Sequence, residues 1–293
     1  MFKKNFNARE ARKGFSMVSI FLIYSLIFFV YPLVWMIILM FSKWNFISTP
    51  KFAGFYNIQT VLSSEIFWIT ILNTLRFMVF YIPIVLIASF LFALMLRRIK
   101  YGKTFIALSF LVAQVCSGVA YSIIFSKLLS PIGPINIFLN THFHFTVPWF
   151  TSPNMAMFTI ALIVTWKFVG YYGIIFYSGM NSISNSLYEA ADLDGASKKR
   201  QFFGITLPLL NAQVVLVLVL SITLAFGLFT ETFIITGGGP LSSTMTPMLV
   251  MYNAAFQQLQ PTYAATMAVF VALISAGIVK VTKKIIERDV TIV

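Results

Sequence analysis

The hydrophobic positions of this chain are gathered into six long runs that contain almost no charged residues. About 20 consecutive apolar residues are enough for a helix to cross the hydrocarbon core of a bilayer. Open sheets cannot satisfy their backbone groups in lipid, so the spanning segments are expected to be helices. The pattern therefore predicts an all-α, polytopic membrane protein with six transmembrane helices: Phe15–Phe41, Phe67–Leu96, Thr104–Phe125, Met155–Met180, Leu209–Thr236 and Thr262–Ile286.

The composition of the chain agrees with this class. Of the 293 residues, 59% are hydrophobic and only 10% are charged, and the mean hydropathy of +0.89 excludes an ordinary soluble domain. The first apolar run is too long for the core of a signal peptide and has no small-residue cleavage site, so it is expected to be retained. Cys116 is the only cysteine, and it allows no internal disulfide.

The basic residues predict how the chain is oriented in the membrane. Of the 21 lysines and arginines, 16 lie in four stretches: residues 3–13, 97–103, 198–200 and 280–288. The alternate loops carry only Lys43, Lys51 and Lys127. Because short cytoplasmic loops are rich in lysine and arginine, both termini and the stretch Glu189–Pro208 are predicted to be cytoplasmic. The net charge of +13 is therefore a topology signal, and no nucleic-acid partner is expected.

The predicted outer loops are longer and differently built. Residues 42–66, residues 127–154 and the stretch Thr236–Pro247 (TGGGPLSSTMTP) are rich in glycine and proline, which indicates irregular backbone. These nearly uncharged loops form either a shaped docking surface or plain connections, and composition alone does not separate the two.

The charged stretch Glu189–Pro208 (EAADLDGASKKRQFFGITLP) differs from the apolar sequence around it. Ser186 and Glu189 have the spacing of a capping box, in which each side chain accepts a hydrogen bond from the other residue's amide. The helix that they begin is expected to end at Gly195, which suits the left-handed conformation of a helix end.

A second short helix is expected to follow at once. Ser197 is placed to cap it, and the helix is expected to run from Lys198 to Gly204. Pro208 lies where the first turn of the fifth span begins, a position at which a missing N–H costs little. Local chemistry therefore predicts two short helices joined at Gly195 across the cytoplasmic face.

No group of residues suggests catalysis. Asp192 and Asp194 lie two positions apart and point to different sides of a helix, which is a poor arrangement for paired acid–base work. His142 and His144 form an isolated pair in an outer loop, whereas zinc needs about four convergent ligands. The stretch Gly237–Pro240 lacks the lysine and Ser/Thr of a phosphate-binding loop. The chain is expected to be neither an enzyme nor a metal protein.

Three charged residues fall inside the predicted spans, where burial is costly: Arg76, Lys167 and Glu231. Arg76 lies near the outer end of its span and is expected to reach the membrane surface. Lys167 shares a polar stripe with Tyr171 and Ser178, and the fifth span carries a second stripe of Ser221, Leu224, Leu228 and Glu231. The two stripes either line a polar path or join helices. Acidic residues are too sparse for an ion-coupled carrier, which favours an external energy source.

Several motifs together resemble a known family. Residues 188–210 (YEAADLDGASKKRQFFGITLPLL) have the Glu-Ala-Ala sequence, the following glycine and the later Ile-Thr-Leu-Pro of the EAA loop. NTLRF (residues 73–77), GPIN (residues 133–136), Trp166 and TGGGP (residues 236–240) agree with the same pattern. On these residues the chain resembles the permeases of ABC importers in the carbohydrate-uptake branch, and in particular the larger maltose-type subunit.

The resemblance implies the type I ABC-importer transmembrane fold with cytoplasmic coupling helices. It divides the chain into a basic segment (1–14), a first transmembrane helix (15–41), a core permease domain (67–286) containing the EAA loop (181–208), and a tail (287–293). In such permeases the coupling helices dock in a cleft of an ATPase, where the glutamate meets a basic group and the glycine forms a hinge. The implied coupling residues are Glu189, Ala190, Ala191, Asp194, Gly195, Ile205, Leu207 and Pro208.

The same resemblance implies the partners and the location. They are a second, different permease subunit, two cytoplasmic ATPase subunits and an extracellular or periplasmic sugar-binding protein, in the plasma membrane of a bacterium or archaeon. This chain is expected to bind no cofactor, since ATP and magnesium are used by the ATPase. The implied function is half of the path of an ATP-driven importer of sugars, oligosaccharides in particular.

The implied sugar path lies near mid-membrane along Trp166, Lys167, Tyr171, Ser221, Leu224, Ala225, Leu228 and Glu231. The maltose type has asparagines and an aromatic residue where this chain has Ala225, Leu228 and Leu224. Lys167 either favours an anionic sugar or pairs with Glu231 or with lipid headgroups. Glycerol phosphate, a uronate oligosaccharide and a stand-alone secondary transporter or channel stay open as alternatives.

Overall fold

The structure is a computed structural model that describes residues 8–287. Almost all regular structure in this range is helical, which confirms the predicted all-α class. The exception is an antiparallel hairpin of β1 (Ser42–Lys43) and β2 (Lys51–Phe52), in which Lys43 stands directly opposite Lys51. The first half of the predicted segment 1–14 and nearly all of the tail 287–293 lie outside the described residues.

The chain forms two compact units, and residues 8–64 and 251–270 belong to the first. It contains α1 (Ala8–Ser25), the π-helical turn η1 (Leu26–Val30), α2 (Tyr31–Met40), the hairpin, α3 (Tyr56–Leu62), η4 (Asn253–Gln257) and the beginning of α14 (Pro261–Ile286). The buried Asn57 side chain donates from Nδ2 to the carbonyl oxygens of Leu39, Met40 and Ser42 at 3.3, 3.1 and 2.6 Å. Asn57 thereby satisfies carbonyl groups that the end of α2 leaves free.

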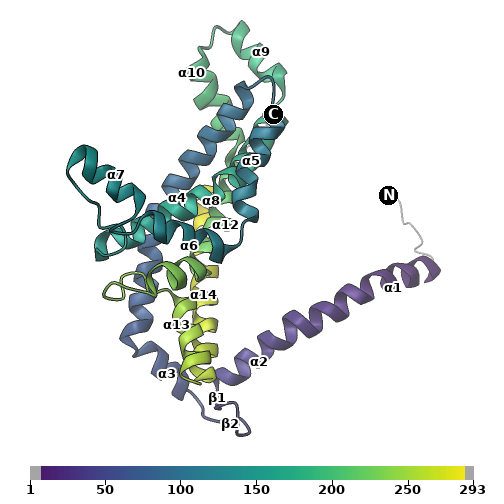
Figure 1. The fold of residues 1–293 in the computed structure, drawn as a ribbon. Helices are drawn as coiled ribbons and strands as arrows, with labels where there is room; N and C mark the ends of the chain where they lie inside the picture. Colours follow the sequence, from purple (N-terminus) through teal and green to yellow (C-terminus); the bar gives the residue numbers. More distant parts are fainter. Residues whose placement is uncertain (1–7, 288–293) are drawn as a thin grey trace. The chain divides into compact units, whose positions relative to one another are not determined.

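Residues 65–250 and 271–287 form the second unit (Figure 1). Its long helices are α4 (Glu65–Arg98) and α8 (Pro153–Ser182), and α5 (Lys103–Val115), α6 (Gly118–Leu128) and α7 (Pro134–Phe143) connect them. After α8 come α9 (Asn185–Leu193), α10 (Lys198–Gln201), η2 (Phe202–Thr206), α11 (Leu207–Leu209), α12 (Asn211–Phe226), η3 (Thr232–Thr236) and α13 (Pro247–Tyr252). Figure 1 shows α9 and α10 as a pair at one end of this unit, beyond the body of α4 and α8.

Four helical stretches are long and apolar enough to cross a membrane: Gly14–Met40, Glu65–Arg98, Pro153–Ser182 and Pro261–Ile286. They agree with four of the six predicted spans to within a few residues. The other two predicted spans are broken in the structure. The described residues therefore contain four spans, or up to six if each bent helix pair counts as one, by length and composition.

The two breaks correct the expectation of continuous helices at Thr104–Phe125 and Leu209–Thr236. α5 and α6 meet at 93°, because Cys116 and Ser117 between them have extended backbone with ψ of 140° and 131°. Lys198–Leu209 and α12 meet at 57°, and α12 then ends at Gly227. The sequence contains one turn signal at this break, Ser117–Gly118, but the apolar run continues on both sides of it.

The core of the second unit lies between α4, α8 and α12. Phe77 and Tyr81 of α4, Tyr172 of α8 and Val217 and Ala225 of α12 are among its buried side chains. The helices approach closely because α8 carries small residues at the contacts, as is usual between membrane helices. A Cβ atom on Gly173 would lie 2.4 Å from the Phe92 ring, and one on Gly170 would lie 2.6 Å from Cβ of Phe110.

Two of the quoted motifs contain an asparagine that holds a loop in place. Asn73 donates from Nδ2 to the carbonyl oxygens of Ser242 and Met245 at 2.7 and 3.0 Å, and so fixes the loop that follows TGGGP. Asn136 donates to the carbonyl oxygens of Ser130 and Val147 and accepts from the Val147 amide at 2.9 Å. Both asparagines are buried, so these motifs hold the predicted outer loops in place from within.

Candidate functional site

The first candidate site is the helix pair α9–α10, and it begins at a different serine from the one predicted. α9 begins at Asn185, and its cap is Ser184, whose hydroxyl accepts from the Ser186 amide at 3.3 Å. The expected capping box of Ser186 and Glu189 is therefore wrong, since Ser186 already lies in the first turn. Several serines stand close together here, and local chemistry alone did not select among them.

The other end of α9 agrees with the prediction. Gly195 has φ of +71°, its amide donates to the Asp192 carbonyl at 3.1 Å, and the Ala196 amide donates to the Ala191 carbonyl at 2.9 Å. This is the double hydrogen bond of a Schellman helix end. A Cβ atom on Gly195 would meet nothing within 4 Å, so a substitution there strains the backbone without causing a clash.

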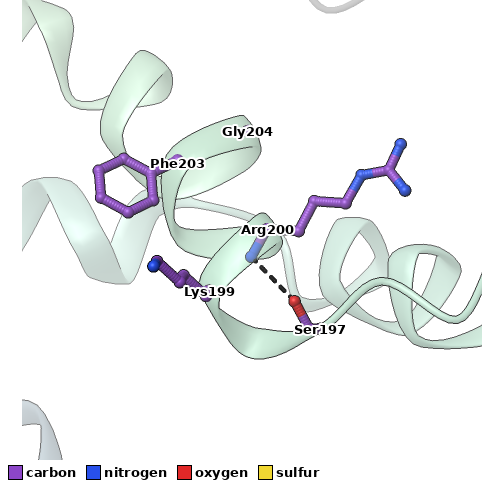
Figure 2. A pocket seen from close by; sticks show the side chains of 5 residues that line it. All are labelled: Ser197, Lys199, Arg200, Phe203 and Gly204. Carbon is purple, nitrogen blue, oxygen red and sulfur yellow. Dashed lines mark hydrogen bonds between the residues drawn. The ribbon is translucent and has the colours of Figure 1, made fainter.

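α10 is capped as predicted but ends differently. The Ser197 hydroxyl accepts from the Arg200 amide at 3.3 Å, as Figure 2 shows. The expected helix Lys198–Gly204 instead ends at Gln201 and continues through η2 and α11 to Leu209. Pro208 thus lies inside α11, ahead of the bend at Leu210, and does not open α12 itself.

A polar clamp joins the two short helices. Lys198 Nζ lies 2.9 and 3.0 Å from the two carboxylate oxygens of Asp192, and Gln201 donates to the same carboxylate and to the Ala196 carbonyl. The pKa of Asp192 is lowered, first by the hydrogen bond from Lys198 and then by that from Gln201. Sequence reasoning missed this clamp, although opposite charges on either side of the Gly195 turn were a usable signal.

The helix pair is also attached to the end of α4. The Tyr188 hydroxyl lies 2.8 Å from the Thr206 hydroxyl, and the Arg97 guanidinium carbon lies 5.3 Å from the centre of the Tyr188 ring. Arg97, Tyr188 and Thr206 also line a pocket of about 330 Å³ between these elements. A displacement of α9 would therefore be transmitted to α4 as well as to α12.

The outer surface of the pair is exposed. Of the predicted coupling residues, Glu189, Ala190, Asp194, Gly195 and Leu207 are exposed, whereas Ala191, Ile205 and Pro208 are half-buried. The Leu193 side chain is 91% exposed and that of Phe203 is 58% exposed. Within residues 14–287, whose side chains the structure describes, the Glu189 carboxylate makes no hydrogen bond or ion pair. Exposed apolar side chains beside an unpaired acid suit a protein partner better than water.

A shallow cationic pocket of about 480 Å³ lies on α10 and the turn that follows it. Figure 2 shows its lining side chains on one short stretch of helix: Ser197, Lys199, Arg200, Phe203 and Gly204. The pocket therefore combines two cationic side chains, Lys199 and Arg200, with one aromatic ring.

The second candidate site, the predicted sugar path, is divided by the structure. Trp166 and Tyr171 on α8 are 46% and 38% exposed, and Lys167 is half-buried. On α12 and beyond it, Ser221 and Ala225 are fully buried, Leu228 and Glu231 are buried, and Leu224 is half-buried. The α8 residues thus lie at the surface of this chain, whereas most of the α12 stripe packs into its core.

An aromatic ring separates Lys167 from Glu231, two of the three charged residues of the predicted spans. Lys167 Nζ lies 4.4 Å from the centre of the Tyr121 ring, and the Tyr121 hydroxyl hydrogen-bonds to the Glu231 carboxylate. Lys167 therefore forms a cation–π contact. No ion pair between Lys167 and Glu231 occurs in the part of the chain that the structure describes. Tyr121, on α6, was missed by sequence reasoning because it belongs to neither stripe.

Comparison with known proteins gives consistent matches. The family profile "Binding-protein-dependent transport system inner membrane component" matches residues 67–291. The chain is 30% identical to the probable ABC transporter permease protein YesP of Bacillus subtilis over 281 residues, which cover 93% of this chain and 90% of that protein. It is 32% identical to the lactose transport system permease protein LacF of Rhizobium radiobacter over 77% of this chain and 78% of that one.

The fold is similar to that of solved transporters. A chain in the crystal structure of a bacterial alginate ABC transporter, in complex with an alginate pentasaccharide-bound periplasmic protein, superposes with a TM-score of 0.81. The identity is 21%, and the similarity covers 94% of each chain. With the family match over most of its length, the chain belongs to the binding-protein-dependent transport system inner membrane components, as a multi-pass permease of an ABC transporter.

Proposed function

We propose that this chain is one of two different permease subunits of an ATP-driven, binding-protein-dependent sugar importer, with α9 and α10 as its coupling helices. The observation that carries the proposal is the helix pair itself. It is closed by Gly195, clamped at Asp192, and presents Glu189 and Leu193 outward. Similarity to a lactose permease protein and to an alginate transporter supports sugars, oligosaccharides in particular, as the cargo.

The proposed topology has six spans and both termini in the cytoplasm, in the plasma membrane of a bacterium or archaeon. It counts the bent pair α5–α6 as one span and α12, which follows the bend at Leu210, as another, so that α10 stays in the cytoplasm. The support is the placement of basic residues at the ends of the chain and around residues 97–103 and 198–200. The division into a first transmembrane helix (15–41), a core permease domain (67–286) and the EAA loop (181–208) is part of this proposal.

In the proposed mechanism, two ATPase subunits bind ATP, close, and push the coupling helices of this chain and of its partner permease. Glu189 pairs with a basic group of the ATPase, and Gly195 sets the angle between α9 and α10. The exposed Ala190, Asp194 and Leu207 contribute to the same surface, and Ala191, Ile205 and Pro208 support it from below. ATP and magnesium are used by the ATPase, so this chain carries force and needs no cofactor of its own.

Force reaches the membrane through two connections. The helical stretch from α10 through α11 leads into α12 at the bend of 57°. Tyr188 contacts Thr206 and Arg97, which lies in the last turn of α4. Because α4, α8 and α12 share one core, a tilt of the helix pair changes how these helices expose the sugar path.

The proposed sugar contacts are the side chains of α8 that reach the surface: Trp166, Lys167 and Tyr171. Aromatic rings suit the apolar C–H faces of sugar rings. Ser221, Leu224, Ala225 and Leu228 hold α12 and the residues after it against α4 and α8, whereas Glu231 is held by the Tyr121 hydroxyl of α6. Lys167 faces rings and no carboxylate, and this observation favours a second candidate cargo, an anionic sugar such as a uronate oligosaccharide or glycerol phosphate.

The test is purification of the tagged chain from its native membrane, followed by transport in proteoliposomes. The proposal predicts that an ATPase and a second permease are retained, and that uptake of an oligosaccharide requires ATP and a sugar-binding protein. Uptake by this chain alone, without nucleotide, would contradict the proposal and favour a secondary transporter.

A further inference from the structure

A pocket in the first unit is not explained by the proposed path. It has a volume of about 500 Å³ and lies between the β1–β2 hairpin, α3 and the beginning of α14. Lys43, Trp44, Asn45, Lys51, Tyr56 and Gln260 are among its lining side chains. By the proposed topology, the loop that carries the hairpin faces the outside of the cell.

The two lysines of this pocket form an unbalanced pair. They stand directly opposite each other in the hairpin, a placement in which like charges destabilise a strand pair. Both are exposed, and neither makes an ion pair with any side chain of residues 14–287. None of the residues that line the pocket is acidic. The pair therefore gives this pocket a local positive charge that favours an anionic ligand.

The other walls of the pocket suit a sugar ring. The Trp44 ring is held by ring contacts with Trp35 and Phe46, at centroid distances of 6.3 and 4.9 Å, and Tyr56 is exposed. Aromatic rings of this kind offer a flat apolar face with a polar edge. Asn45 Oδ1 accepts hydrogen bonds from the amide and the hydroxyl of Ser48, and these bonds hold the loop in place. The Nδ2 group of Asn45 remains available to donate hydrogen bonds to a ligand.

Taken together, the lining offers donors and cations but no carboxylate. The Gln260 side chain adds further hydrogen-bonding capacity at the start of α14. A ligand that fits this chemistry has an apolar ring face, many oxygen acceptors and a negative group. These are the properties of an anionic sugar unit, and a concave pocket with a few convergent polar groups suits a small ligand.

We propose that this pocket is a second saccharide site, separate from the membrane path, that binds an anionic sugar unit between Lys43, Lys51 and the ring of Trp44. Its place on the outer side rests on the proposed function. The site would hold one end of an acidic oligosaccharide before or during its entry into the path. A protein partner would use a flatter surface. Lysines beside Trp and Tyr also occur where helices meet lipid headgroups, so retention of phosphatidylglycerol is measured to separate the two ligands.

The test measures equilibrium binding of digalacturonate and of a neutral galactose disaccharide to the full-length chain in neutral-lipid nanodiscs, at low ionic strength. No nucleotide or binding protein is present, so the outcome is independent of whether the chain supports ATP-driven uptake. Digalacturonate is expected to bind at least about tenfold more tightly than the neutral disaccharide, since the lysines form charge-assisted hydrogen bonds with its carboxylates. Added salt is expected to reduce this preference, because exposed charges are screened.

Three variants sharpen the test. Lys43→Gln combined with Lys51→Gln is expected to abolish the preference for digalacturonate, and Trp44→Ala to weaken both sugars. Lys127→Gln, the third lysine of the predicted outer loops and a residue of the second unit, is the matched control and is expected to bind as the wild type does.

The outcomes that overturn the proposal are distinct. The proposal is overturned if the wild type and the double lysine variant bind digalacturonate with equal affinity. It is also overturned if Lys127→Gln loses as much affinity for digalacturonate as the double lysine variant. A double variant that changes only the retention of phosphatidylglycerol would also overturn it and would assign the lysines to a headgroup. A double variant that changes only capture of the sugar-binding protein would assign them to a protein interface.

Discussion

The helix pair α9–α10 is rich in charged residues whereas α12 carries none, and different forces determine the structures of the two regions. In the helix pair, caps, a left-handed glycine and one charged clamp fix the backbone, and the outer side chains stay exposed. On α12, burial against α4 and α8 decides which side chains are accessible. Local chemistry therefore predicts the first region well and the second poorly.

The largest effect is expected for Gly195→Val. A β-branched residue in the left-handed conformation costs about 1–2 kcal/mol, which changes the angle between α9 and α10. We expect ATP-driven uptake to fall at least about tenfold, a change of about 1.4 kcal/mol, while the protein still inserts in the membrane. Uptake in proteoliposomes and the amount of protein in the membrane measure the two quantities.

Gly204→Ala is the matched control for this variant. Gly204 is also exposed, a Cβ atom there meets nothing within 4 Å, and its φ is not positive. Uptake by this variant is expected to match the wild type. A loss in Gly204→Ala as large as that in Gly195→Val would mean that the left-handed conformation is not what matters.

The next prediction separates the two halves of the sugar path. Ala225→Leu adds volume to a fully buried position and is expected to destabilise the fold by about 1–3 kcal/mol, seen as a lower melting temperature. Tyr171→Ala removes a partly exposed ring, so it is expected to raise the KM for sugar with little change in melting temperature. Normal stability in Ala225→Leu, or an unchanged KM in Tyr171→Ala, would contradict the division between buried and exposed halves.

The smallest effect is expected for Asp192→Asn, because the clamp is exposed to water. The pKa of Asp192 is lowered in the folded state, so its stabilising effect is present above its unfolded pKa of about 3.9 and is lost as the pH falls through the folded value. We expect faster amide hydrogen exchange around the Gly195 turn in the variant near neutral pH, and no difference from wild type in strong acid. Asp194→Asn, a neighbouring exposed acid outside the clamp, should exchange as the wild type does.

Features that depend on neighbouring residues could be predicted from the sequence, whereas features that depend on contacts between distant residues could not. Gly195 and Ser197 were predicted because their roles depend on a few neighbouring residues. The Ser184 cap was missed because Ser186 fits the same local rule. The break at Cys116 was missed because the apolar run continues on both sides of Ser117–Gly118, the turn signal at that point. The exposed face of α12 could not be predicted from the sequence. A helix that is apolar all round does not indicate which side contacts lipid and which side contacts protein.

The long-range contacts explain the remaining differences. Tyr121 lies between Lys167 and Glu231 because the chain bends by 93° between α5 and α6. Neither of the two polar stripes lies on these helices, so the stripes did not indicate the bend. The spacing of NTLRF and TGGGP indicated a family, but only the fold brings Asn73 to the carbonyl groups of Ser242 and Met245. Such pairs need the path of the whole chain.

The central claim is that the exposed Glu189 carboxylate meets an ATPase, and Glu189→Gln tests it most directly. The variant and the matched control Glu287→Gln, an exposed acid near the end of the chain, are compared for retention of the ATPase on purification and for ATP-driven sugar uptake. Removing one charge from a desolvated interface pair costs about 2–5 kcal/mol, so both quantities should fall at least tenfold for Glu189→Gln alone. Retention and uptake equal to those of the wild type would contradict the account.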